Sequence, residues 1–226
     1  MWNRFRLSRG PLRWWLLACG LVLATFDPVR MAIGLALVLS GAILHLIAKA
    51  CLWQNRILST AGPYRFTRNP FYLANLAIDA GLMVVIGSLW MAAVFLTLWV
   101  VVYRQTIADE ERTLRQLFGE AFDAYCARVP RLVPRPWRYL KLDESTGPSL
   151  TWRNPNLVTG TEWPRVLRIL SSPWIMACAG AMRASWLEQE GPWLAMATGG
   201  CALTLWCLGE LAALWIARRK ARWARV

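Results

Sequence analysis

The sequence predicts an all-α protein, a polytopic transmembrane helical bundle with about six crossings. Of its 226 residues, 57% are hydrophobic and only 17% are charged, a composition typical of membrane proteins. Polar turns separate six apolar segments, and together these segments suit one compact bundle. Lys and Arg number 26 against 13 Asp and Glu, so the net charge is +13. Because the basic residues lie between apolar segments, we predict contact with anionic lipid headgroups and no nucleic-acid partner.

The apolar segments follow one another with recognisable boundaries. The first is short and is preceded by arginines, but no cleavage pattern follows it, so we expect an uncleaved crossing. Asp27-Pro28 and Gly87-Ser88 indicate turns, with Ser88 as an N-cap. Pro70 fits the first turn of the third helix. The expected segments are 14–26, 31–52, 71–86, 89–103, 166–186 and 193–217.

The distribution of basic residues predicts the orientation. If all six segments cross, the dense basic clusters at 4–13, 49–68, 104–168 and 216–224 fall on one side. Positive charge marks the cytoplasmic side, so both termini are expected there. The frequent Arg, Ala and Leu suit a bacterial inner membrane. We therefore predict an integral, multi-pass protein of that membrane.

Three regions follow from this division. Residues 1–135 form a membrane core of four crossings plus cytoplasmic helices. Residues 136–164 are rich in Pro, Gly, Ser and Thr and indicate a cytoplasmic linker. Residues 165–226 form a two-helix transmembrane appendage with a basic tail. Gly199, Gly200 and Gly209 in the appendage could support close helix packing or a homo-oligomer.

The polar end of the core contains two amphipathic helices in this interpretation. Residues 104–118 continue the fourth crossing into water, with apolar side chains on one face. Gly119 can end that helix. Residues 120–129 then read as a second short helix, with Phe122 and Tyr125 on its apolar side and Pro130 after it.

Two motifs could carry chemistry. The loop 62–72 enters the third crossing, where free backbone N–H groups and the Arg68 guanidinium suit an anion. Glu110 and Glu111 follow the fourth crossing and could hold an ammonium group or a ribose. In the alternative interpretation, the loop only anchors a helix at the headgroups, and the glutamates pair with Arg104, Arg112 or Arg115.

The order of these motifs resembles the isoprenylcysteine carboxyl methyltransferase and phospholipid methyltransferase superfamily of integral membrane methyltransferases. The resemblance spans about 62–134, roughly a third of the chain. In that family the position of Asn69 is a His, which can titrate near neutral pH where Asn cannot. The matching elements are Gly62-Pro63-Tyr64-Arg65, Arg68-Asn69-Pro70-Phe71-Tyr72, Glu110-Glu111, Leu114, Phe118-Gly119, Tyr125 and Val129-Pro130-Arg131.

The resemblance implies an S-adenosylmethionine-dependent methyltransferase that acts on a lipophilic substrate at the cytoplasmic membrane face. Carboxyl or other O-methylation and N-methylation of a lipid amine both remain open, and so does a non-catalytic membrane scaffold that retains the fold. The implied catalytic residues are Glu111, Arg68 and Tyr72. The implied cofactor-binding residues are Tyr64, Arg68, Asn69, Pro70, Tyr72, Glu110, Glu111 and Arg131.

Several polar residues lie within apolar segments. Asn75 and Asp79, one helical turn apart, could border a substrate cavity or could bond a neighbouring helix. His45, the only histidine, is expected to make a structural hydrogen bond, with Lys49 one turn further on. Glu210 could pair with Arg183 or cap a packing contact. The six scattered Cys and the single His predict no metal site.

Overall fold

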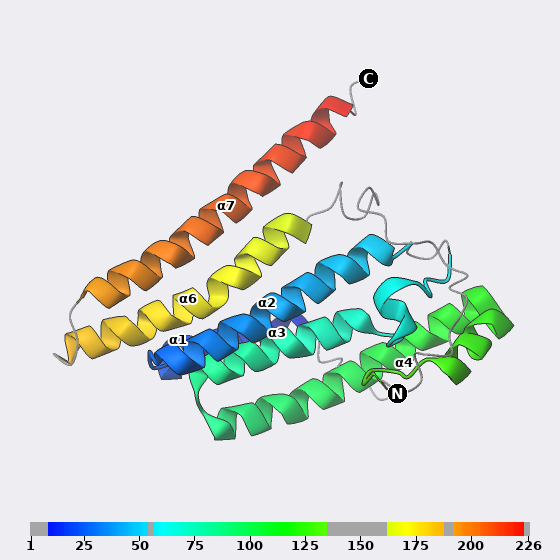
Figure 1. Ribbon diagram of the computed structural model, residues 1–226, viewed down its shortest axis with the longest axis horizontal. Helices are drawn as coiled ribbons and strands as arrows, with labels where there is room; N and C mark the ends of the chain where they lie inside the picture. Colours follow the sequence, from blue (N-terminus) through cyan, green and yellow to red (C-terminus); the bar gives the residue numbers. More distant parts are fainter. Residues whose placement is uncertain (1–8, 54–56, 135–161, 188–191, 224–226) are drawn as a thin grey trace, which may run out of the picture.

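The computed structural model describes residues 9–53, 57–134, 162–187 and 192–223. These residues are almost entirely helical and form an elongated bundle (Figure 1), so the predicted all-α class is confirmed. The helices are α1 (Arg9–Leu23), α2 (Pro28–Cys51), the 3-10 helix η1 (Gly62–Arg65), α3 (Pro70–Ile86), α4 (Leu89–Arg128), α6 (Glu162–Trp186) and α7 (Trp193–Trp223).

Three of these helices are long and apolar enough to cross a membrane, namely α2, α4 and residues Trp193–Ala217 of α7. Trp14–Leu23 and α3 are shorter apolar helices. The chain is therefore a helical membrane protein. The expected number of six crossings also counts α1, α3 and α6, and it stays a prediction.

The helix ends agree with the expected turn chemistry. Asp27 caps α2 by accepting a hydrogen bond from the Arg30 backbone N–H at 2.7 Å. Ser88 caps α4 in the same way, with Met91 as the donor at 3.4 Å. Gly87 ends α3 at φ 73°, and an added Cβ there would lie 1.6 Å from a guanidinium nitrogen of Arg30. The turn between α3 and α4 therefore requires glycine.

Helices α2 and α3 pack with their backbones in contact. A Cβ added at Gly41 would lie 2.7 Å from the carbonyl oxygen of Ala74, and one at Gly81 would lie 2.5 Å from that of Gly34. Small residues permit this close approach, which larger side chains would prevent. The contact fixes the position of α3, and therefore of the loop that precedes it, against the end of α2.

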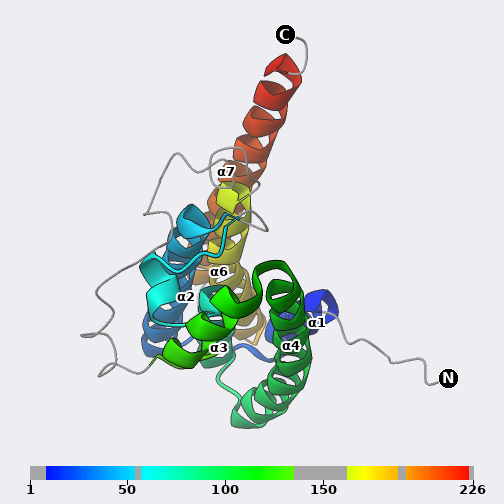
Figure 2. The same ribbon diagram turned by 90° about the vertical axis from the view of Figure 1, so that its right-hand side faces the viewer.

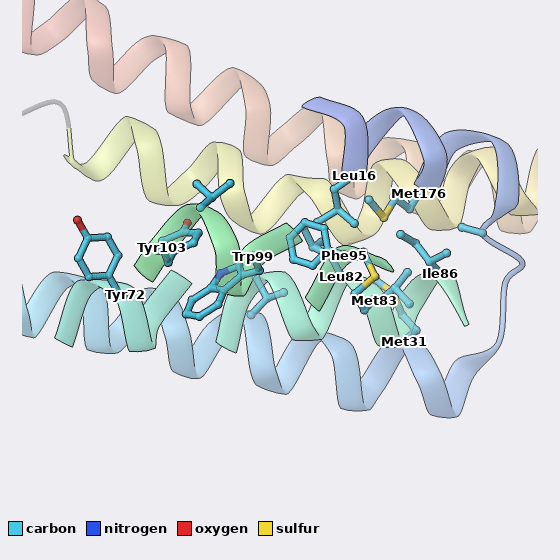
Figure 3. Packing of buried hydrophobic residues seen from close by; sticks show 14 of the residues in the cluster. Leu16, Met31, Tyr72, Leu82, Met83, Ile86, Phe95, Trp99, Tyr103 and Met176 are labelled. Atoms are coloured by element: carbon cyan, nitrogen blue, oxygen red, sulfur yellow. The ribbon is translucent and has the colours of Figure 1, made fainter. Parts of the chain in front are cut away.

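The main hydrophobic core joins the helices around this pair. Leu16 of α1 and Met176 of α6 are fully buried, and Phe95, Trp99 and Tyr103 bring α4 into the same cluster. Figure 3 shows Tyr72 and Tyr103 at one end of the cluster and Met31, Met83 and Ile86 at the other. The core therefore runs along the bundle and reaches the end that carries the polar loop.

The second half of the chain packs on the first. Helix α6 contacts α1, α2 and α3, whereas α7 packs mainly on α6, and its C-terminal end extends past the bundle (Figures 1 and 2). Arg183 donates to the carbonyl oxygens of Leu21 and Ala24. Glu210 pairs with Arg168 at 3.6 Å, so the expected pairing of Glu210 with Arg183 was wrong. Arg183 instead satisfies the carbonyl groups that the end of α1 leaves free.

The regional division at 135 and 165 stays a prediction. Most of the expected linker, 136–164, lies outside the described residues, as do the side chains of the basic tail from 218 onward. Where the structure resumes, α6 begins at Glu162, four residues before the expected segment of 166–186.

Helix α4 turns back on itself near its C-terminal end. Gly119 has φ 50° and ψ −126°, which interrupts the helix, and the following turns of α4 fold back beside the preceding ones (Figures 1 and 2). Phe122 and Tyr125 on the returning segment are buried against Leu114 and Phe118. The predicted break at Gly119 and the second amphipathic helix are both confirmed. The hairpin places residues 129–131 beside the loop that precedes α3.

Candidate active site

The structure brings the loop before α3 to the hydrated end of α4. The Arg68 guanidinium lies 3.5 Å from Oε1 of Glu111, and both side chains are largely buried, at 15% and 10% exposure. Arg68 reaches this position because its backbone N–H donates to the carbonyl oxygen of Pro130 at 2.9 Å. The two motifs, which the third and fourth apolar segments separate in the sequence, therefore lie together in the structure.

Arg131 completes the pairing from the other side of the hairpin. Its Nε donates to Oε1 of Glu111 at 3.2 Å, and one of its terminal nitrogens donates to Oε2. The Glu111 carboxylate is therefore held between two guanidinium groups. A forked contact of this kind fixes orientation as well as charge. Glu111, only 8% exposed, is consequently the central anion of the site.

The alternative view of the glutamates, as partners of arginines on their own helix, does not describe Glu111. Arg112 pairs with Asp109 at 2.9 Å, and Arg115 pairs with Asp123 across the hairpin at 2.8 Å. Both pairs are exposed and contribute little to stability. The buried carboxylate of Glu111 instead pairs with Arg68 and Arg131, the two arginines of the motif.

Asn69 has a clear structural partner. Its Nδ2 donates to the carbonyl oxygen of Arg131 at 2.8 Å, and the Thr67 hydroxyl donates to the same oxygen at 3.2 Å. The Thr67 hydroxyl also accepts from the Asn69 backbone N–H at 3.2 Å. Asn69 therefore holds the loop against residue 131 by neutral hydrogen bonding, which requires no titration. Thr67, which is 2% exposed, was missed from the sequence because it matches no chemical motif.

Tyr64 lies beneath the loop. Its carbonyl oxygen accepts a 2.7 Å hydrogen bond from the hydroxyl of Tyr125, on the returning arm of the hairpin. Burial raises the pKa of both phenols, so both stay protonated and neutral. The Tyr64 hydroxyl itself is buried and has no hydrogen-bond partner among the residues that the structure describes. The Tyr64 ring packs in a small hydrophobic cluster with Ala48 and Cys51.

Tyr72 connects the second glutamate to the core. The hydroxyl of Tyr72 donates to Oε1 of Glu110 at 2.5 Å. The Tyr72 ring meets Tyr103 edge-on at 5.2 Å, and Tyr103 stacks on Trp99 at 4.2 Å. Figure 3 shows these three rings along α3 and α4. Glu110 is exposed whereas the rings are buried, so the row leads from the polar end into the apolar interior.

Asn75 and Asp79 continue along α3 from Tyr72. Asp79 is almost completely buried, at 1% exposure, and Asn75 is partly exposed. Pro70 occupies the first turn of α3, as expected, with Asn69 before it. That Asn75 and Asp79 border a substrate cavity stays a prediction.

The fold defines a helical membrane protein. Residues 29–121 match the family described as phospholipid methyltransferase. The resemblance noted from the sequence is thereby confirmed. The match includes α2, the loop with Arg68, α3 and both glutamates; Arg131 and α6 lie beyond it.

Two characterised proteins are similar over part of the chain. The cobalt-zinc-cadmium resistance protein CzcN of Cupriavidus metallidurans is 37% identical over 82 residues, which is 36% of this chain and 38% of that protein. The nickel-cobalt-cadmium resistance protein NccN of Alcaligenes xylosoxydans xylosoxydans is 35% identical over 78 residues, or 34% and 36% of the two chains. The similarity thus spans little more than a third of each relative. No solved structure matches the chain.

The names of both relatives refer to metal resistance, which raises the question of a metal site in this chain. Among residues 9–53, 57–134, 162–187 and 192–223, no three His, Cys, Asp or Glu side chains gather as they would around a metal ion.

Proposed function

We propose that this protein is an S-adenosylmethionine-dependent methyltransferase that acts at the membrane surface on a lipophilic substrate. The observation that carries the proposal is the meeting of Arg68, Arg131 and Glu111 at the start of α3, within or beside the segment that matches the methyltransferase family. The site offers cations and carboxylates side by side. The amino-acid end of S-adenosylmethionine is a zwitterion, and its ammonium and carboxylate suit these two kinds of group.

The chemistry of the donor set fits this cofactor. Nε of Arg68 and the hydroxyl of Tyr64 are buried donors without a hydrogen-bond partner in the described part of the chain, and either would suit a carboxylate. Glu110 presents an exposed carboxylate at the same end, where it would suit an ammonium or a ribose hydroxyl. Buried polar groups are normally paired, so the free donors favour a ligand.

When bound, the cofactor supplies a methyl group already activated by its sulfonium charge. The residues of the chain then have three tasks. Arg68 and Arg131 orient the ligand, Tyr72 and the rings behind it exclude water, and the loop holds the reacting atoms in line. Such positioning accounts for much of the rate enhancement in group transfer. A carboxylate acceptor needs no base, whereas an amine or hydroxyl acceptor would pass its proton to Glu110 directly or through water.

The substrate would approach from the bilayer, because an apolar tail crosses a polar surface only at high cost. The basic clusters of the sequence favour the cytoplasmic side of a bacterial inner membrane for the site, and S-adenosylmethionine is made in the cytoplasm.

One observation favours a second candidate, a non-catalytic membrane scaffold. Glu111 is already satisfied by two arginines, and Asn69 bonds only backbone, so the same contacts would also serve purely to hold the hairpin against the loop. The metal-resistance function named for the two relatives would allow such a role in a larger assembly. Only the first candidate requires the cofactor to bind.

The decisive experiment is calorimetry of the detergent-purified protein with S-adenosylmethionine and, separately, with the demethylated product. We expect binding in the micromolar range, weakened in Arg68→Ala and retained in Asp123→Asn, which removes an exposed carboxylate of α4. An absence of binding at millimolar ligand would leave the scaffold as the better account.

A further inference from the structure

A second buried charge cluster lies at the same end of the bundle, where α6 begins. The Glu162 carboxylate contacts three cationic or protonatable groups: His45 Nε2 at 2.8 Å, Lys49 at 3.3 Å and Arg165 at 3.6 Å. Glu162 is 5% exposed and His45 is 7% exposed. The cluster therefore joins the first turn of α6 to the last turns of α2.

The cluster also contacts α3. The His45 ring meets the Phe71 ring edge-on with centroids 5.0 Å apart, and the Lys49 ammonium lies 5.8 Å from the centre of the same ring. Phe71 is the second residue of α3 and stands between Pro70 and Tyr72. A path of direct contacts thus leads from Glu162 through His45 and Lys49 to the turn that carries the candidate active site.

A purely stabilising role does not explain this arrangement well. Burying ions costs desolvation, and a buried ion cluster often contributes less than apolar residues of the same size would. What such a cluster does provide is a fixed geometry. Glu162 shares a hydrogen bond with His45 and an ion pair with Lys49, so it holds both side chains against Phe71.

We propose that Glu162 is a positioning residue for the methyltransferase site. It holds His45 and Lys49 against Phe71, and so fixes the first turn of α3, from which Tyr72 reaches Glu110. The effect on cofactor binding rests on the proposed function, whereas the effect of Glu162 on the first turn of α3 does not depend on it. It also gives α6, which lies outside the family match of 29–121, a part in the reaction.

The test combines two measurements on the full-length protein in lipid nanodiscs. Glu162→Gln retains the size and hydrogen-bonding ability of the side chain but removes its charge. Hydrogen–deuterium exchange of peptides covering 66–76 should become faster, and the affinity for S-adenosylmethionine should fall about threefold to thirtyfold. Glu210→Gln is the matched control, because it removes a carboxylate that pairs α7 with α6 through Arg168 at 3.6 Å. It should change neither quantity.

A double-mutant cycle separates positioning from simple docking of α6. In Phe71→Leu the ring that receives the contact is gone, so adding Glu162→Gln should weaken the affinity no further. Additive losses would overturn the inference, as would unchanged exchange in Glu162→Gln.

The two proposals fail differently. If the wild-type protein does not bind S-adenosylmethionine, the proposed function falls, and the cycle is then measured on the exchange of 66–76 alone. If the wild type binds but Glu162→Gln behaves like the wild type in both measurements, only the positioning role falls.

Discussion

Arg131 binds the carboxylate of Glu111, which lies twenty residues earlier in the sequence, across the hairpin that Gly119 creates. The same carboxylate meets Arg68 from the loop before α3. One buried anion thus ties together three segments: the loop, the helix and the returning arm. The candidate site depends on this closure, because Tyr64, Asn69 and Arg131 face it only while the hairpin is folded back.

Glu111→Gln should weaken S-adenosylmethionine binding by about 1.5–3 kcal/mol, because a charged hydrogen bond is lost and two guanidinium groups are left uncompensated. Calorimetry measures the change. Glu110→Gln is the comparison. Glu110 is exposed and accepts a hydrogen bond from Tyr72, so Glu110→Gln should lower the affinity but should lower the melting temperature less than Glu111→Gln does. Equal wild-type affinity in both variants would remove these glutamates from the site.

Arg68→Ala should weaken binding by a similar amount, and Arg68→Lys should restore little of it. A lysine provides one point charge, whereas the guanidinium can contact Glu111 and a ligand carboxylate with separate N–H groups. The measurement is again a titration with the cofactor. Full recovery in Arg68→Lys would mean that Arg68 contributes charge alone.

Gly119→Ala should destabilise the protein by about 1–3 kcal/mol, because φ 50° with ψ −126° is a backbone conformation that a Cβ strains. The cause would be backbone strain, since an added Cβ would meet nothing within 4 Å. Gly200→Ala is the matched control: it is equally open but lies inside α7, where alanine favours the helix. Thermal melting in detergent compares the two, and an equal shift would contradict the strain argument.

The contribution of Glu162 to the stability of the folded protein should depend on pH. The hydrogen bond from His45 lowers the pKa of Glu162 from 4.5 to about 2, with Lys49 and Arg165 assisting. Between these values the unfolded chain binds a proton that the folded chain does not, so stability rises with pH. The contribution is fully present above about pH 4.5 and is lost as the pH falls towards 2.

The comparison of wild type with Glu162→Gln isolates this effect. Their difference in stability should be on the order of 2 kcal/mol at pH 7 and should shrink between pH 4.5 and pH 2. Melting temperatures at pH 7, 4 and 3 measure it. A difference that stays constant over this range would show that the carboxylate is not ionised at low pH in the folded protein.

Local sequence signals predicted much of this fold. Pro70 at a helix start, Ser88 as an N-cap and Gly119 as a break are each read from one or two residues, and each has the expected role. Turn and cap chemistry is local, so it survives whatever the rest of the chain does. The family resemblance named Arg68, Glu111 and Arg131, and the structure brings them together; their role in binding a cofactor stays a prediction.

Long-range pairings could not be predicted in the same way. Glu162 fell in an expected linker, and nothing nearby in the sequence indicated that it would meet His45, a residue 117 positions earlier. The pairing of Glu210 was wrong for a related reason: the packing of α7 on α6 places residue 209 beside Arg168, whereas Cys178, which is nearer to Arg183, contacts Ala195. Such choices depend on tertiary contacts.

The glycine seam between α2 and α3 has a consequence for how a lipid tail could arrive. The backbones of α2 and α3 are already in contact at Gly41 and Gly81, so these two helices form a rigid pair. The backbones of α4 and α3 approach each other less closely, and the two helices meet through side chains such as Tyr72 and Tyr103. On the proposed function, a lipid tail would enter between α3 and α4, and the closely packed α2–α3 pair would form the fixed side of that path.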